Sequence, residues 1–396
     1  MSRPALKFCL VTPSFPLAER PTRGGSTTYA EHLAKVLLQH DFEVHVVLYQ
    51  ETHLPAATAL LAVKLHVITL RAIPYFSALL PGVAEAWQLG SFLQELDQRE
   101  HFAAVEGAND EGKLLFAVRY FRERFVIRLH SSLRQHITGK KQPLTWARRF
   151  SVWLDKQTVR RCLRRVTHSH LHATEMAHEY GISVDSIQVF PHAVESPKPI
   201  LTAPRPCIEQ PVIIYIGTLD RRKGIDILLA AIPSVLNRFP QAELRVIGRD
   251  GGDSPAASWK DWFQATTSSK NSCRRVVFTG PVTDEALNVH WQEASLVVIP
   301  SRYESFGYIL AEAFARGVPA LATRGGALPE VARDGALLVE PNNPSALAEG
   351  AMQLLTDTTL ASKLIARGHE LYYQHYTLDR FGKNVIALHR QGITQQ

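Results

Sequence analysis

The sequence predicts an α/β protein made of two domains, each built on a doubly wound parallel sheet. Short, nearly continuous apolar segments alternate with segments whose apolar residues recur at helical spacing. Strands that are buried on both faces of a parallel sheet read as such apolar runs. The alternation restarts after a proline-rich stretch at residues 196–210, which has the composition of a linker. A chain of 396 residues is also long for a single hydrophobic core.

Residues 1–195 are therefore assigned to an N-terminal domain and residues 211–375 to a C-terminal domain. In the first, the pattern predicts strands at 6–11, 42–48, 65–70, 103–105, 125–129 and 187–190, with helices at 27–39, 85–96, 111–121 and 145–164. In the second, it predicts strands at 212–216, 243–247, 276–278, 296–299 and 319–322, with helices at 225–237, 284–292, 306–316 and from 344 onward.

The composition excludes several other classes of protein. Hydrophobic residues make up 45% of the chain and charged residues 20%, which is typical of globular proteins and not of disordered ones. No apolar run approaches the ~20 residues that cross a bilayer, and the first residues lack the apolar core of a signal peptide. The four cysteines are dispersed without metal-ligand spacing, so we expect reduced thiols, no structural metal and a cytoplasmic location.

One basic segment, residues 144–165, is expected to form an amphipathic helix. It carries Trp146 and Trp153 together with seven of the lysines and arginines behind the net charge of +7. Two interpretations stay open: peripheral contact with an anionic membrane surface, or packing on the helix's own domain with a solvated basic face, which is the more common arrangement. Nucleic-acid binding is not expected, because no recognised nucleic-acid motif accompanies the charge.

The residues suited to chemistry follow predicted strands. Gly25 belongs to a Gly-Gly pair after the first strand, His130 follows the strand at 125–129, a cationic turn at 217–224 follows the strand at 212–216, and Glu304 follows the strand at 296–299. Ligands of open parallel sheets bind outside the carboxyl ends of the strands, so the clustering favours a polyanionic ligand. Taken singly, paired glycines are mostly turns, and one histidine among 17 can be an ordinary interior residue.

Glu304 and Glu312 are separated by seven residues across a predicted strand, turn and helix. The first N–H groups of a helix that begins near Phe306 have no partner within the helix and can hold an anion. One acid beside this anion site and a second acid set back from it suit a ligand with both phosphate and hydroxyl groups, such as a nucleotide sugar. The competing interpretation is that Glu304 caps the helix and Glu312 is a satisfied, half-buried side chain.

Taken together, these elements resemble the retaining glycosyltransferases of the GT-B fold, in the large bacterial family with an E-x7-E signature (family 4-like). The resemblance covers nearly the whole chain, and its specificity lies in the order of its parts. Those parts are the Gly24-Gly25 pair, His130, residues 190–194, residues 217–224, Glu304 to Glu312, and residues 324–330. The resemblance also implies that a C-terminal helix over about 376–396 packs back on the N-terminal domain.

The resemblance implies a nucleotide-diphosphate sugar, UDP- or GDP-linked, bound chiefly to the C-terminal domain. Its diphosphate would be contacted by Lys223 and Arg222, by backbone N–H groups near Phe306 and Gly307, and by the backbone of Gly25. No cofactor and no metal is implied, because no Asp-x-Asp loop stands at a strand end. Fixed cations and dipoles would stabilise the leaving diphosphate instead.

The resemblance further implies that Glu312 binds the ribose hydroxyls, that Glu304 orients the sugar, and that His130 lies over the transferred sugar. Retention of the anomeric configuration of the sugar is implied by the resemblance alone. With no carboxylate clearly placed as a nucleophile, the hypothesis is front-face attack, with the departing phosphate oxygen taking the acceptor's proton. The acceptor is a hydroxyl of a glycan, a lipid-linked molecule or a small molecule, as in polysaccharide biosynthesis.

Two positions depart from the family pattern. Thr218 stands where arginine is frequent, and His192 stands where asparagine is usual. The rival hypotheses are a catalytically silent GT-B-fold binding protein, and a sugar phosphorylase or epimerase of the same fold. A dinucleotide-dependent dehydrogenase is disfavoured, because neither half has G-x-G-x-x-G after its first strand.

Overall fold

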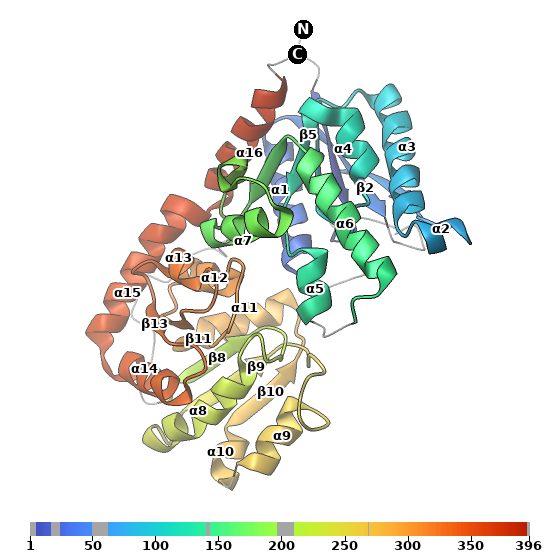
Figure 1. Ribbon diagram of the computed structural model, residues 1–396. Helices are drawn as coiled ribbons and strands as arrows, with labels where there is room; N and C mark the ends of the chain where they lie inside the picture. The colour runs from blue at the N-terminus through green and yellow to red at the C-terminus, as the bar shows by residue number, and fades with distance from the viewer. Residues whose placement is uncertain are drawn as a thin grey trace. The chain divides into compact units, whose positions relative to one another are not determined.

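A computed structural model describes residues 5–16, 24–49, 62–139, 143–195, 210–267 and 269–393. The chain divides into two compact units. Unit 1 comprises Met1–Pro191 together with Leu378–Gln396, and unit 2 comprises His192–Thr377. The stretch at 196–210, expected to be a linker, lies outside the described residues except for its last position. Each unit is α/β with one parallel sheet, as the sequence predicts (Figure 1).

Unit 1 contains a seven-stranded parallel sheet in the order β3-β2-β1-β4-β5-β6-β7. Its strands are β1 (Leu6–Thr12), β2 (Phe42–Tyr49), β3 (Lys64–Ile68), β4 (Ala104–Ala108), β5 (Phe125–Arg128), β6 (Arg164–Thr167) and β7 (Ile187–Val189). The helices are α1 (Gly25–Gln39), α2 (Phe76–Leu79), α3 (Val83–Glu100), α4 (Leu115–Phe121), α5 (Leu133–Gly139), α6 (Trp146–Arg161), α7 (His170–Tyr180) and α16 (Leu378–Ile393). The apolar strands are buried on both faces, which explains their continuous apolar sequence.

Unit 2 repeats this topology with a six-stranded parallel sheet in the order β10-β9-β8-β11-β12-β13. Its strands are β8 (Val212–Ile216), β9 (Glu243–Ile247), β10 (Val276–Gly280), β11 (Leu296–Ile299), β12 (Ala320–Thr323) and β13 (Leu337–Val339). The helices are α8 (Ile225–Arg238), α9 (Trp259–Thr266), α10 (Lys270–Arg274), α11 (Asp284–Glu293), α12 (Tyr308–Arg316), α13 (Leu328–Ala332), α14 (Pro344–Thr356) and α15 (Thr358–Leu371). In both sheets the strand order reverses once, between β1 and β4 and between β8 and β11.

The basic segment at 144–165 is not one helix, contrary to the prediction. Helix α6 ends at Arg161, and Arg164 and Arg165 open strand β6. The Arg165 side chain donates through Nε to the carbonyl of Val159 at 2.8 Å and through Nη2 to the carbonyl of Arg160 at 2.8 Å. It therefore caps the carboxyl end of the helix instead of extending its basic face.

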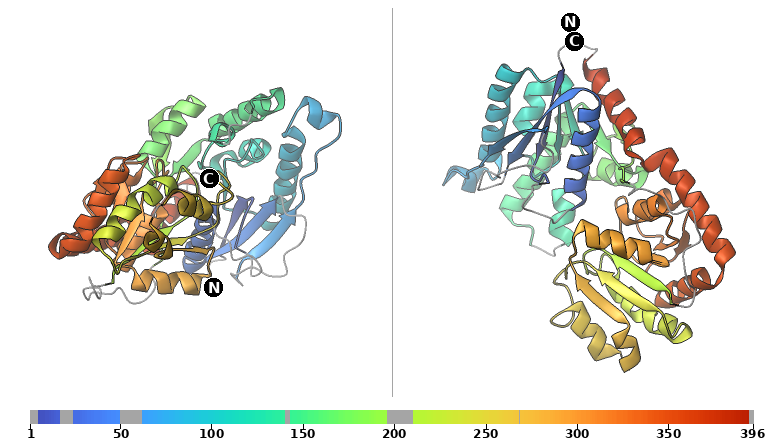
Figure 2. Two further views of the ribbon diagram at one scale, coloured as in Figure 1. Left: turned by 90° about the horizontal axis from the view of Figure 1, so that it is seen from below. Right: turned by 180° about the vertical axis from the view of Figure 1, so that it is seen from behind.

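Helix α16 packs in unit 1 against α1, although the two helices stand at opposite ends of the chain (Figures 1 and 2). They approach closely at Gly382, where an added Cβ would lie 2.9 Å from a methyl group of Val36. Helix α16 also brings His389 to a fully buried carboxylate, Glu106 of β4, with 2.9 Å between His389 Nε2 and Glu106 Oε2. Unit 1 is therefore assembled from two separated parts of the sequence.

A buried charge cluster forms around Glu106. Its Oε1 accepts hydrogen bonds from the Tyr29 hydroxyl and from Arg128 Nε, the latter at 3.3 Å, and its Oε2 is bound by His389. All four side chains are buried. Burial by itself would raise the pKa of Glu106, but the Arg128 guanidinium and the hydrogen bonds from His389 and Tyr29 outweigh it and lower the pKa to about 2. The carboxyl group is therefore ionised at neutral pH.

Candidate active site

The predicted site residues follow strands that lie at, or next to, the place where each sheet reverses its strand order. In unit 2, the turn that carries Lys223 follows β8, and the loop that carries Glu304 follows β11. Strands β8 and β11 are hydrogen-bonded neighbours, so their carboxyl ends open side by side. In unit 1, Gly25 follows β1 and His130 follows β5, close to the reversal between β1 and β4. This is where open parallel sheets bind ligands.

The turn after β8 holds Lys223 in a fixed backbone geometry. The Lys223 amide donates to Asp220 Oδ1 at 2.7 Å. The next residue, Gly224, has φ +72°, and an added Cβ would lie 2.0 Å from the carbonyl oxygen of Pro300 at the end of β11. Only glycine fits so near another backbone in this conformation. The turn is therefore locked against the loop that carries Glu304.

Glu304 is the centre of a small polar cluster in unit 2. Its Oε1 accepts a hydrogen bond from Lys223 Nζ at 2.5 Å and another from Ser301 Oγ at 2.9 Å. The Glu304 side chain is 11% exposed and that of Lys223 is 23% exposed, so both are screened from water but reachable. The pair combines a fixed cation, suited to phosphate, with a carboxylate suited to a hydroxyl group.

The loop after β12 supports Glu304 through its backbone. The N–H of Ala327 donates to the carbonyl of Glu304 at 2.7 Å. Gly326 has φ +62°, and an added Cβ would lie 2.3 Å from that same carbonyl oxygen. The Gly325-Gly326 pair therefore has a packing role, because it lets this loop meet the backbone of Glu304 directly.

Glu312 lies on α12, which begins at Tyr308 with Gly307 as its N-cap. The helix was expected to begin at Phe306, so Glu312 is just over one turn into it, and not two. Arg316 lies 3.6 Å from the Glu312 carboxylate. Burial raises the pKa of Glu312, and Arg316 opposes that shift. The Glu312 side chain is 24% exposed, which leaves it accessible to a ligand.

Phe306 and Gly307 are the two residues that immediately precede α12. The ring of Phe306 is buried and meets the ring of His192 edge-on at 5.2 Å, while Tyr308 stacks on His192 at 5.0 Å. A ligand at this helix start would therefore meet the backbone of Phe306 and not its ring. His192, which departs from the family pattern, serves as a packing partner for this turn.

The two arginines near the Lys223 turn have distinct environments. Arg222 is half-exposed, with Nη2 3.8 Å from an Asp220 carboxylate oxygen. Arg302 was not anticipated from the sequence. It makes a two-pronged ion pair with Asp226, at 2.7 and 2.9 Å, and so ties the Glu304 loop to helix α8. No local sequence signal marks this pair, because its members are 76 residues apart.

In unit 1, Gly25 is the first residue of α1, two positions earlier than the helix start expected from the sequence. The N-cap Gly24 has an extended backbone, and no atom of the described residues lies within 4 Å of a Cβ added there. Among the described residues, none therefore blocks close approach to the backbone of Gly24. Arg23, which precedes this pair, lies outside the described residues.

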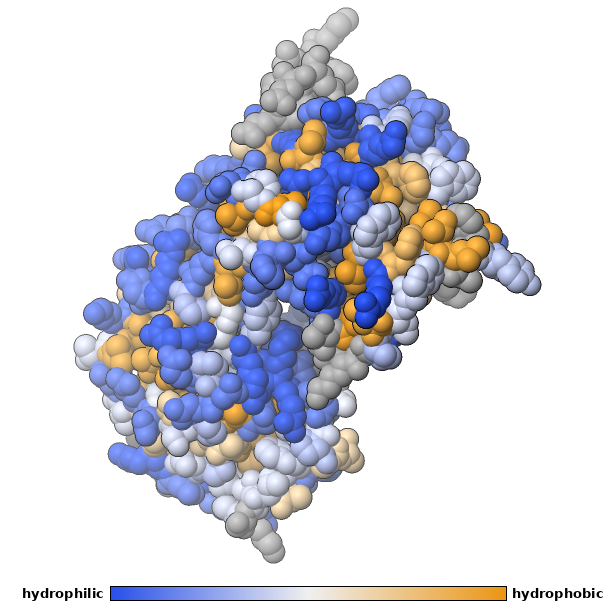
Figure 3. Space-filling view, in the orientation of Figure 1, coloured by the Kyte–Doolittle hydropathy of each residue, from blue (hydrophilic) through white to orange (hydrophobic). Residues whose placement is uncertain are grey.

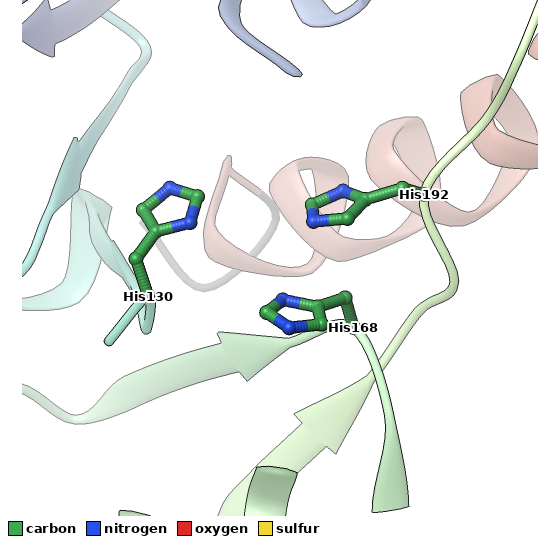
Figure 4. Close-up of side chains that lie close together, drawn as sticks. All are labelled: His130, His168 and His192. Atoms are coloured by element: carbon green, nitrogen blue, oxygen red, sulfur yellow. The ribbon is translucent and has the colours of Figure 1, made fainter. Parts of the chain in front are cut away.

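His130 is held by groups from three elements of unit 1. Its backbone N–H donates to Asn109 Oδ1 at 2.6 Å, its ring meets Tyr29 edge-on at 5.8 Å, and its ring faces that of His168 at 6.4 Å (Figure 4). Burial lowers the pKa of His130 to about 3, with a further contribution from the positive charge of Arg128. The imidazole is therefore neutral at physiological pH, able to donate one hydrogen bond and accept another.

The structure thus brings Lys223 and Glu304 into direct contact and places Glu312 on the helix that follows Glu304. Three residues that were not anticipated contact the candidate residues: Ser301 and Asp220 within unit 2, and Asn109 within unit 1. Each stands within a few residues of a strand end, which was the only signal available for them. Among the described residues, no helix has the length and apolar character needed to cross a membrane.

Comparisons with known proteins identify the family to which each half of the chain is similar. Residues 23–196 match the model of "Glycosyltransferase Family 4", and residues 207–371 match the model of "Glycosyl transferases group 1". The D-inositol 3-phosphate glycosyltransferase of Corynebacterium diphtheriae is 38% identical over 148 residues, which are 37% of this chain and 34% of that protein. The matched stretches cover between 34% and 54% of the first curated relatives.

Solved structures resemble the chain over almost its full length. Sucrose-phosphate synthase from Thermosynechococcus elongatus aligns with a TM-score of 0.72 and 20% identity, over 99% of this chain and 100% of that one. Anabaena HepE in complex with UDP and glucose aligns with a TM-score of 0.66 and 18% identity, over 96% and 98%. At these identities the likeness establishes the GT-B fold. The chain belongs to the GT-B glycosyltransferases whose two halves are of the family 4 and group 1 types.

Proposed function

We propose that this protein transfers a hexosyl group from a nucleotide-diphosphate sugar to a hydroxyl acceptor, with retention of anomeric configuration. One observation carries the proposal: the Lys223 ammonium and the Glu304 carboxylate lie 2.5 Å apart at the carboxyl ends of β8 and β11. This pair offers a cation to the diphosphate and an acceptor oxygen to the sugar hydroxyls. The family 4-type and group 1-type matches support the same class of reaction.

In this proposal, Lys223 and Arg222 of unit 2 bind the donor diphosphate together with the backbone of Phe306 and Gly307. Negative charge grows on the diphosphate as the bond to the sugar breaks, and preorganised cations and amides stabilise charge that develops in a transition state. Glu312 accepts hydrogen bonds from the ribose. Because burial raises the pKa of Glu312, donor affinity is expected to fall as pH drops through that raised pKa and the carboxylate is lost.

The reaction proposed is attack on the same face from which the diphosphate leaves. The acceptor oxygen forms the new bond to the anomeric carbon, the bond from that carbon to the phosphate oxygen breaks, and the acceptor's proton passes to that phosphate oxygen. Glu304 orients the sugar through its hydroxyls. His130, which is neutral, supplies a hydrogen bond to the transferred sugar without introducing a charge.

A UDP-sugar is the favoured donor, with a GDP-sugar as the alternative. The favoured choice is supported by the structural likeness to Anabaena HepE, which has been solved with UDP and glucose and with UDP-glucose. The acceptor class stays broader. A glycan, a lipid-linked molecule or a small polar molecule each offers the required hydroxyl group.

We also propose peripheral contact of helix α6 with an anionic membrane. Trp146, Phe150 and Trp153 form an aromatic row along α6, with ring centroids 5.7 and 5.5 Å apart, and both tryptophans are more than half exposed. Figure 3 shows hydrophobic residues gathered over α2 and α3, beside hydrophilic ones. Exposed indoles next to arginines suit an anionic bilayer surface.

The membrane contact is tested by co-sedimentation of the protein with phosphatidylglycerol vesicles. Trp146→Ser and Trp153→Ser should each weaken binding to the vesicles. Binding of both variants equal to that of the wild type would refute the contact.

The donor assignment is tested by thermal shift with UDP, GDP and ADP, and with their glucose, galactose and mannose conjugates. A ligand that binds only the native state raises the melting temperature, by an amount that grows with concentration over Kd. We expect a shift with one nucleotide family that persists in EDTA and disappears in Lys223→Ala. No shift with any nucleotide at millimolar concentration would overturn the donor site and favour a silent binding protein.

A further inference from the structure

The backbone of the turn that carries His130 is bound by the side chain of Asn109. Asn109 follows β4 and is 92% buried. Its Oδ1 accepts the backbone N–H of His130 at 2.6 Å, and its Nδ2 lies 3.5 Å from the carbonyl of His130. The backbone of Asn109 in turn donates to the carbonyl of Arg128 at 3.1 Å. This one amide therefore bridges the ends of β4 and β5 where His130 emerges.

A chain of buried hydrogen bonds extends from Asn109 to helix α6. Asn109 Nδ2 donates to the Tyr180 hydroxyl at 2.8 Å, and that hydroxyl donates to Asp155 Oδ2 at 2.8 Å. Tyr180 is the last residue of α7, and Asp155 lies on the buried face of α6. Both side chains are 98% buried, so this chain runs through the interior of unit 1.

The direction of each bond in this chain follows from the chemistry of its members. An ionised carboxylate only accepts, and a phenol has a single proton. The Tyr180 hydroxyl must therefore donate its hydrogen bond to Asp155. Its oxygen can then accept a hydrogen bond from the amide of Asn109. The –NH₂ end of Asn109 is thereby turned toward Tyr180. Its carbonyl oxygen is left facing the N–H of His130, which is the arrangement that the His130 turn requires.

We propose that Asn109 is a positioning residue for His130, and that the ionised Asp155 sets the direction of the Asn109 amide through Tyr180. An oppositely directed amide would place an –NH₂ group against the N–H of His130, two donors face to face. A buried polar group without a partner is costly, so the His130 turn would shift. The significance for catalysis rests on the proposed function of His130; the geometry of the turn does not.

In this series of hydrogen bonds, Asp155 is the residue whose protonation state can change. Burial raises its pKa to about 6, while the hydrogen bond from Tyr180 opposes the shift. The charges that face it from the β4–α4 loop are Asp110 and Glu111, which add to the rise, and Lys113, which pairs with both of them. Lys156 and Arg160 are the nearest cations along the sequence of α6 itself.

Protonation of Asp155 removes the constraint on the chain. A protonated carboxyl group can donate to the Tyr180 oxygen, and Tyr180 can then donate to Asn109. That bond requires the carbonyl end of the Asn109 amide, so the amide reverses and the N–H of His130 loses its acceptor. Because the folded-state pKa is the raised one, this change occurs as pH falls through about 6.

The test is an NMR titration of the His130 backbone amide in ¹⁵N-labelled full-length protein between pH 8 and 5. We expect the cross-peak of the wild type to move with a midpoint near the pKa of Asp155, about 6. In Asp155→Asn the side-chain oxygen can still accept from Tyr180 but cannot titrate, so the midpoint should disappear. In Tyr180→Phe the peak should be displaced at every pH. Tyr120→Phe, which removes a hydroxyl bonded to Asp97 in the same unit, is the matched control and should leave the peak unchanged.

A second readout separates positioning from general damage. If transfer activity is measured, Tyr180→Phe should lower kcat several-fold and leave the KM for the donor unchanged, because most of the proposed donor contacts belong to unit 2. A His130 peak that is insensitive to pH and to both the Asp155 and Tyr180 substitutions would overturn the proposal. That result is distinct from failure of the proposed function, in which the NMR titration appears as expected but no nucleotide sugar is used.

Discussion

Replacement of Lys223 by alanine should lower kcat/KM for sugar transfer by roughly 10²–10³-fold, which is the usual effect of removing one preorganised group that stabilises transition-state charge. Two effects act together. The substitution removes a fixed cation from the carboxyl ends of β8 and β11. It also leaves Glu304 without its 2.5 Å partner, so that a carboxylate only 11% exposed faces an incoming diphosphate. Repulsion between the Glu304 carboxylate and the negatively charged diphosphate then opposes donor binding.

The measurement is steady-state transfer with the donor identified by thermal shift. Lys223→Arg keeps the charge but changes its shape, so it should retain more activity than the alanine variant. Arg222→Ala should have a smaller effect, because that side chain is half-exposed and screened by water. Lys363→Ala, on the exposed face of α15, is the control for a general loss of positive charge. Equal activities of Lys223→Ala and Lys363→Ala would remove Lys223 from the donor site.

Replacement of Glu106 by glutamine should destabilise the protein by about 3–5 kcal/mol, the range found when one partner of a buried ion pair is removed. Arg128 is 99% buried, and among the described residues neither its Nη1 nor its Nη2 has a hydrogen-bond partner, so its charge depends on the Glu106 carboxylate. Glutamine keeps the shape of the side chain, and the loss therefore reports on charge. Urea unfolding followed by circular dichroism at pH 7 measures the effect.

The matched control is Glu100→Gln. Glu100 pairs with Lys7 at 2.6 Å but is one-quarter exposed, and such pairs contribute about 0–1 kcal/mol. The pH dependence supplies a second check. Because the pKa of Glu106 is lowered to about 2, its contribution is complete above the unfolded-state value near 4.5 and is lost as pH falls toward 2. The Glu106→Gln variant should lack this acid-sensitive part of its stability. Equal losses in the two variants would show that the buried cluster contributes little.

The main architecture could be predicted from the sequence because its signals are local. Apolar runs and helical spacing mark most strands and helices, and the candidate site residues were singled out because they follow predicted strands. Strand β6 was missed because Arg164 and Arg165 prolong the basic pattern of α6, whereas in the structure Arg165 reaches back to cap that helix. From the sequence alone, an arginine that binds backbone carbonyl groups cannot be distinguished from an arginine that is exposed to solvent.

The residues that support the site were beyond local analysis for a different reason. Asn109, Tyr180 and Asp155 are separated in sequence but meet in the interior of unit 1, and each alone is an ordinary polar residue. Glu106 and His389 are 283 residues apart. Pairings of this kind depend on the tertiary fold, and a hydrogen-bond direction depends on the protonation of a third group. Neither leaves a periodicity in the sequence.

Helix α16 has a consequence for the order in which the protein forms during synthesis. A ribosome produces residues 5–191, with all seven strands of the first sheet, long before it produces residues 378–393. Until then, Val36 lacks the surface of Gly382 and the Glu106 carboxylate lacks His389. While the whole of the second unit is translated, the nascent first unit therefore has an uncovered apolar helix, α1, and an incompletely paired interior charge, Glu106. Completion of the first unit is thus timed by the synthesis of the second.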